Sequence, residues 1–71
     1  MRVIIHDLYK NTQLVYEGDP VTMERKLYED FPWAVAGNEG NLEFILYTID
    51  HTQNFGVEVV DPLPHPFLKG P

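Results

Sequence analysis

Residues 41–60 read NLEFILYTIDHTQNFGVEVV and contain the longest apolar run of the chain. Four apolar residues of this run recur with the i, i+3, i+4, i+7 spacing of one helix face: Leu42, Ile45, Leu46 and Ile49. Asn41 precedes them as an N-cap, and Asn54 or Gly56 can end the helix. The β-branched and aromatic content also suits a strand that is buried on both faces. We favour the helix over residues 42–53, because its apolar arc is continuous and polar residues follow it.

Three strands are expected outside residues 42–53, whether those residues form a helix or a strand. The last alternates apolar residues with Gly56 and Glu58, as a half-buried strand does: Phe55, Val57 and Val59. Residues 2–9 and 12–17 are rich in β-branched side chains and predict an antiparallel hairpin. Its tip is expected at the two residues Lys10 and Asn11, because asparagine tolerates the left-handed conformation of tight turns.

The segment 20–31 predicts a helix. Asp19 is a suitable N-cap, Pro20 suits the first helical position, and Pro32 disfavours helical geometry beyond Phe31. A broad apolar face is expected from these residues: Val21, Leu27, Tyr28 and Phe31, with Met23 at the edge. Glu24 falls inside this arc and either splits it or lies at its rim. Residues 32–41 then form a connection whose apolar side chains are expected to pack onto the core: Trp33, Ala34 and Val35.

These elements predict an α+β fold. The expected order is β-β-α-α-β, with a three-stranded, mainly antiparallel sheet and two helices on one face. A strand over residues 42–53 would give β-β-α-β-β instead. Residues 1–61 are expected to form a single domain. Residues 62–71 read PLPHPFLKGP and predict an extended, proline-rich C-terminal tail.

Size limits the stability of such a domain. A chain of 71 residues has room for one core, and at this length folding buries only about 60% of the unfolded surface. It has no cysteine, so disulfides cannot reinforce it. A homodimer is therefore an alternative to a monomer. No signal peptide or membrane-spanning run is evident, so we expect a cytoplasmic protein.

The net charge is −6, and residues 40–61 contain four carboxylates and no lysine or arginine. Nucleic acids and anionic membranes attract cationic proteins, so neither is an expected partner. A protein partner with a basic surface fits this charge. Solubility alone is the simpler explanation of the acidic excess.

The sequence offers little for catalysis. It contains neither cysteine nor serine, and its three histidines lack the spacing of metal ligands. His6 with Asp7, and Asp50 with His51, are sequence neighbours that point in different directions on a strand or helix. We therefore expect no enzyme, no metal site and no cofactor.

Aromatic residues make up 13% of the chain, more than a small core can enclose. We expect four of them mostly in the core: Phe31, Trp33, Phe44 and Phe55. On a helix, Glu43, Tyr47 and Asp50 share the outer side and form an aromatic and acidic patch. We predict that a partner binds there, with contributions from His51 and from Phe67 of the tail.

Two hypotheses of function follow. The first is a non-enzymatic, small acidic protein-binding module, a regulator or inhibitor that occludes a basic surface of a larger protein. An origin in a phage or another mobile element would suit that role. The second is a self-assembling structural subunit. A small metal-binding protein or enzyme is a weaker third alternative.

Overall fold

The computed structural model describes residues 1–61. Its elements follow in the order β1 (Arg2–Asp7), β2 (Thr12–Glu17), α1 (Pro20–Asp30), α2 (Pro32–Val35), α3 (Leu42–Asp50) and β3 (Phe55–Asp61). The expected β-β-α-α-β order is confirmed, with the one-turn helix α2 added between the two longer helices. The helical interpretation of residues 42–53 is correct for Leu42–Asp50. The expectations for the tail, residues 62–71, lie outside the described residues.

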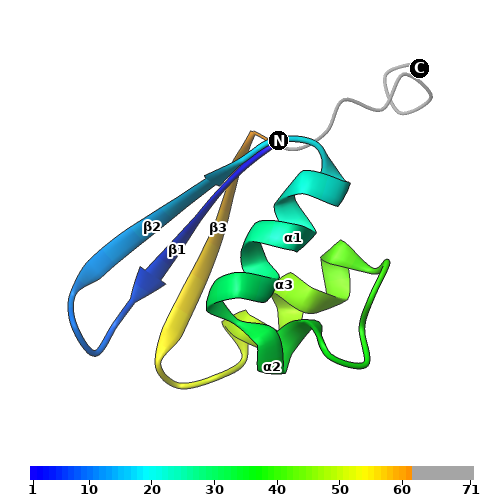
Figure 1. Cartoon of the computed structure of the whole chain (residues 1–71). Coiled ribbons are helices and arrows are strands. Elements are labelled where there is room, and N and C mark those ends of the chain that lie inside the picture. The colour runs from blue at the N-terminus through cyan, green and yellow to red at the C-terminus, as the bar shows by residue number, and fades with distance from the viewer. Residues whose placement is uncertain (62–71) are drawn as a thin grey trace, which may run out of the picture.

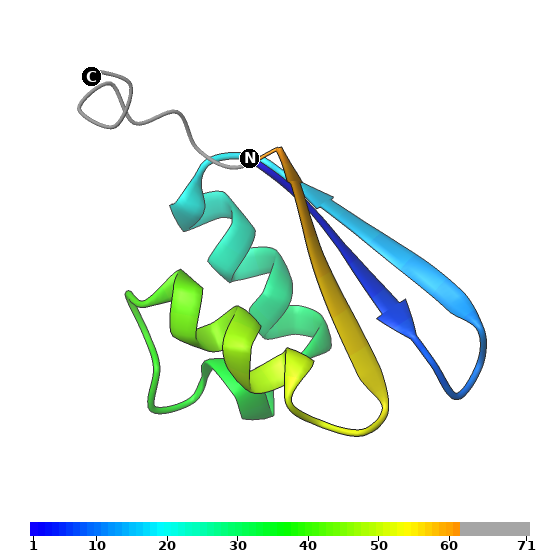
Figure 2. The same ribbon diagram turned by 180° about the vertical axis from the view of Figure 1, so that it is seen from behind.

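The three strands form one antiparallel sheet in the order β2-β1-β3. The helices cover one face of this sheet, and no helix of residues 1–61 covers the other, which we call the open face (Figures 1 and 2). Val3 and Ile5 of the central strand are fully buried toward the helices. Their neighbours Ile4 and His6 alternate to the open face, as the period-two geometry of a strand requires. Strand β1 is thus the centre of both the sheet and the core.

The hairpin between β1 and β2 differs from its expected form. The strand ends at Asp7, and the tip comprises four residues, 8–11, instead of the expected Lys10 and Asn11 alone. The Asp7 carboxylate accepts hydrogen bonds from the Tyr9 and Lys10 amides at 3.0 and 2.9 Å. These bonds start the turn directly after Asp7, earlier than a two-residue turn at Lys10 and Asn11 would. Asn11 does adopt the left-handed conformation, with φ 59°.

Helix α1 is capped as expected, but its buried face is displaced. The Thr22 amide donates to Asp19 Oδ1 at 2.8 Å. Met23 and Leu27 are fully buried, whereas Val21 and Tyr28 are 69% and 56% exposed. The expected inclusion of Val21 and Tyr28 in the buried face is therefore wrong.

The reason for this displacement lies in Glu24, which separates the two halves of the apolar arc. Its carboxylate accepts the Gly40 amide at 3.0 Å at the rim of the core. Only one half of the arc can then face the sheet, because a carboxylate is costly to bury away from its partner. The half that contains Met23 and Leu27 packs inward.

Residues 32–35 form the one-turn helix α2 where a connection was expected. Ala34 and Val35 pack into the core as predicted, but Trp33 is half-exposed. Its ring lies 5.9 Å from that of Phe31 and 6.4 Å from that of Phe55. Trp33 therefore covers the edge of the core and is not enclosed by it, because the two smaller residues after it occupy the interior positions.

Tyr16 joins β2 to the end of α1. Its ring is buried, and its hydroxyl donates to Asp30 Oδ2 at 2.6 Å. Burial raises the pKa of the Tyr16 hydroxyl well above its ordinary value, and the hydrogen bond to Asp30 and the negative charge of that carboxylate raise it further. The hydroxyl therefore remains a donor throughout the physiological range.

Replacing Asp19 with alanine is expected to lower the melting temperature at neutral pH, because the Thr22 amide loses its acceptor. The backbone and side-chain hydrogen bonds with Thr22 hold the pKa of Asp19 below its ordinary value. Since the folded pKa is the lower one, this stabilisation is complete above the unfolded pKa and is lost as the pH falls through the folded pKa. Thermal melts of the two proteins should differ at neutral pH and converge in acid. A difference that persists unchanged at the lowest pH would contradict this assignment.

Candidate functional site

Helix α3 places five side chains on its surface away from the core. Steps of 100° per residue put them within an arc of about 120°. Ile45, Leu46 and Ile49 occupy the opposite side and are buried. We call this surface the α3 outer face: Glu43, Phe44, Tyr47, Asp50 and the C-cap residue His51. All five residues are exposed in the described structure.

Three rings form a continuous column along the α3 outer face. The centroids of Phe44 and Tyr47 are 5.5 Å apart with the planes 18° from parallel, and those of Tyr47 and His51 are 3.8 Å apart. Phe44 is 48% exposed and Tyr47 52%. The column results from the i, i+3, i+4 spacing of helix neighbours, which stacks side chains one above the other. It presents aromatic surface in a fixed arrangement.

The helix ends hold this column in place. Asn41 Oδ1 accepts the Phe44 amide at 3.1 Å at the start, and the Thr48 hydroxyl donates to the Phe44 carbonyl at 2.8 Å. At the other end, His51 Nδ1 lies 3.0 Å from the Tyr47 carbonyl. A carbonyl can only accept, so Nδ1 carries the proton and Nε2 is the nitrogen left for other partners. The imidazole is thereby fixed beside the Tyr47 ring.

The two carboxylates of the α3 outer face differ in their role. Asp50 Oδ1 accepts the Val57 amide at 2.9 Å and ties the end of α3 to β3. Glu43 lies in the first turn of α3, and no hydrogen bond or ion pair within residues 1–61 engages its side chain. Both are exposed, so both contribute negative charge, but Glu43 alone is not committed to holding the fold.

Of the five predicted partner-binding residues, the structure brings four together: Glu43, Tyr47, Asp50 and His51. Phe67 lies outside the described residues. Phe44 was expected in the core, and this is wrong, because it is half-exposed and stacks on Tyr47. Its position three residues before Tyr47 was the available signal, since that spacing puts both on one side of a helix.

Most carboxylates elsewhere hold local structure. Asp7, Asp19 and Glu24 each accept backbone amides, and Asp30 accepts the Tyr16 hydroxyl. Two more lie beside cationic or ionisable partners on the open sheet face: Glu17 with Arg2, and Glu58 with His6 at 3.3 Å. Carboxylates therefore occur over much of the surface, because many of them stabilise local structure. The feature that distinguishes the α3 outer face is the aromatic column more than the negative charge.

A hollow of about 440 Å³ lies at the start of this face. Its lining residues are all exposed: Asn41, Glu43, Phe44 and Tyr47. A second hollow, of about 470 Å³, lies between α1 and the loop before α3, where Tyr28 and Arg25 contribute to the wall. A small-molecule site usually encloses most of its ligand. A shallow hollow lined by exposed side chains, as the first is, instead suits the contact surface of another macromolecule.

Within residues 1–61 no group of three or more histidines and carboxylates is placed to hold a metal ion. None of the helices in that range has both the length and the apolar character needed to cross a bilayer. Comparisons with protein-family models, curated proteins and solved structures find no match to this chain. Function is therefore inferred from the surface of the molecule itself.

Proposed function

We propose that this chain is a non-enzymatic protein-binding module that uses the α3 outer face to cover a basic surface on a larger protein. The observation that carries the proposal is the exposed column of Phe44, Tyr47 and His51 beside Glu43 and Asp50. A module of this kind acts as a regulator or inhibitor by excluding other ligands from the surface it covers. A chain without cysteine needs no oxidising compartment to fold, so a cytoplasmic location suits this role.

The aromatic column supports the binding part of the proposal. Tyrosine and other aromatic side chains dominate the energetic centres of protein interfaces, because they bury large areas at a small loss of conformational entropy. Here the stacking of Tyr47 between two rings and the hydrogen bond of His51 to the helix end have already restricted the rotamers. Less entropy is then lost when a partner covers them.

The charge supports the basic character of the partner. No lysine or arginine occurs between residues 40 and 61, which include α3 and β3. Glu43 and Asp50 lie on either side of Tyr47 along the helix. A cationic side chain that approaches the column therefore meets carboxylates and aromatic rings together, both of which attract it.

Selection from a displayed library of random peptides tests this proposal without a known partner. Peptides are selected on the immobilised wild-type chain, with counter-selection on a Tyr47→Ala variant. We expect the enriched peptides to contain lysine or arginine, and to bind more weakly as salt is raised, because exposed charges are screened. Glu43→Gln should weaken their binding, whereas Glu29→Gln, which removes an exposed charge from α1, should not.

Three results would count against the proposal. The first is enrichment of neutral or acidic peptides. The second is binding that does not change with salt. The third is equal binding by the wild-type chain and the Tyr47→Ala variant, which would place the binding surface elsewhere.

A further inference from the structure

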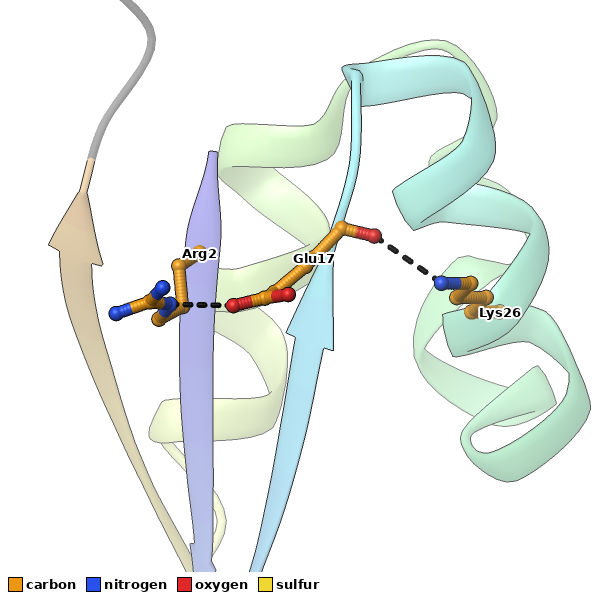
Figure 3. A network of polar contacts seen from close by, with 3 residues as sticks. All are labelled: Arg2, Glu17 and Lys26. Carbon is orange, nitrogen blue, oxygen red and sulfur yellow. Dashed lines mark hydrogen bonds and ion pairs between the residues drawn. The ribbon is translucent and has the colours of Figure 1, made fainter.

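Strand β2 is an edge of the sheet, since β1 is its only neighbour within residues 1–61. A contact of Glu17 shows which backbone groups of β2 point outward, away from β1. The Glu17 carbonyl accepts a hydrogen bond from Lys26 Nζ of α1 at 3.1 Å, on the side away from β1 (Figure 3). In an antiparallel sheet, the amide and the carbonyl of one residue point to the same side of the strand, and every second residue points to that side. The amide and carbonyl groups of Gln13 and Val15 therefore also point outward.

Little protects this edge. Natural proteins guard exposed edges with lysine, proline, bulges or covering elements. Within residues 1–61, the protection of β2 consists of Lys26, which reaches the last residue, Glu17, and of Arg2, which pairs with the Glu17 side chain (Figure 3). Leu14 is 42% exposed and Val15 58%, on opposite faces of the sheet. In the part of the chain that the structure describes, the edge thus combines apolar side chains with outward-pointing backbone groups that no strand pairs.

We propose that β2 pairs antiparallel with β2 of a second copy of this chain, which joins the two sheets into one of six strands. A twofold axis at Val15 uses all three outward-pointing residues, Gln13, Val15 and Glu17, in hydrogen-bonded pairs. A carbonyl oxygen has two lone pairs, so the Glu17 carbonyl can keep Lys26 while it accepts the new strand.

The charge pattern favours this register over one with the axis at Glu17. With the axis at Val15, each Glu17 lies opposite the neutral Gln13 of the second copy, whose amide can donate to it. An axis at Glu17 would place two like charges directly opposite each other, which is destabilising. The chosen register also puts Val15 against Val15 on the open face, and Leu14 against Tyr16 of the second copy on the helix side. Two half-exposed apolar side chains of each copy are then covered.

Cysteine substitutions test the register, because the chain has no cysteine of its own. Val15→Cys places two thiols opposite each other, with Cα atoms about 5.5 Å apart, inside the range a disulfide allows. Gln13→Cys is the matched control, since its two copies are offset by four residues, roughly 13 Å along the strands. Under mild oxidation we expect a covalent dimer from Val15→Cys and none from Gln13→Cys. Equal cross-linking of both, or of neither, would overturn the proposal.

Sedimentation of the wild-type protein and of a Val15→Lys variant gives an independent test. We expect wild type to shift from monomer to dimer as its concentration rises. Val15→Lys, which sets two like charges across the axis, should raise the dimer dissociation constant at least about tenfold. Circular dichroism must show that this variant keeps its fold, which its exposed position favours. Wild type that stays monomeric at all concentrations, or a dimer unaffected by Val15→Lys, would overturn the proposal. Neither result bears on peptide binding by the α3 outer face.

Discussion

Replacing Phe31 with alanine is expected to lower the free energy of unfolding by about 3–5 kcal/mol, the usual cost of removing a buried phenylalanine. Phe31 is almost fully buried where α1 meets α2. Its ring contacts those of Tyr16 at 6.4 Å, Trp33 at 5.9 Å and Phe55 at 5.1 Å. One substitution thus opens a cavity and removes aromatic contacts to β2, α2 and β3 together.

Such a loss is large for this chain, because small domains are stabilised by only about 5–15 kcal/mol in total. Urea denaturation followed by circular dichroism measures it. Tyr28→Ala is the control, since Tyr28 lies three residues earlier, in the last turn of α1, and is 56% exposed. We expect that substitution to cost less than about 1 kcal/mol. Equal effects of the two substitutions would mean that the burial of Phe31 and the exposure of Tyr28 are assigned wrongly.

Replacing Tyr47 with alanine should weaken binding of the selected basic peptides by at least ~2 kcal/mol, roughly 30-fold in dissociation constant. Tyr47 is the middle ring of the column, so its removal also takes away the ring on which Phe44 and His51 both pack. Fluorescence anisotropy with a labelled peptide from the selection measures the effect. The fold should survive, because Tyr47 is exposed and alanine favours helix.

Two controls separate the role of the ring from general effects. Tyr47→Phe keeps the stacked surface and should retain most of the affinity. Tyr9→Ala removes a tyrosine that is still more exposed, at the hairpin tip, and should leave affinity unchanged. If Tyr9→Ala weakened binding as much as Tyr47→Ala, the hairpin would be the better candidate for the binding surface.

Local signals predicted the elements of this fold because they act within a few residues. The N-caps at Asp19 and Asn41 accept amides three residues on, as the sequence indicated. The apolar spacing over residues 42–49 outweighed strand propensity, since one helix face could bury Ile45 and Ile49 at once. These local signals also gathered Glu43, Tyr47, Asp50 and His51 on one surface, because neighbours on a helix are set by its geometry.

The tertiary structure alone decided the placements that depend on distant partners. The β2-β1-β3 order requires β3 to pair with β1, some fifty residues earlier in the chain. The side of α1 that is buried depends on Glu24 reaching Gly40 across the core rim. The separation of two aromatics of one expected apolar face into buried Phe31 and exposed Tyr28 depends on which positions face the sheet. The periodicity of a sequence indicates which residues share a face of a helix or strand. Which of these faces is buried depends on the free energy of packing against a particular neighbouring surface.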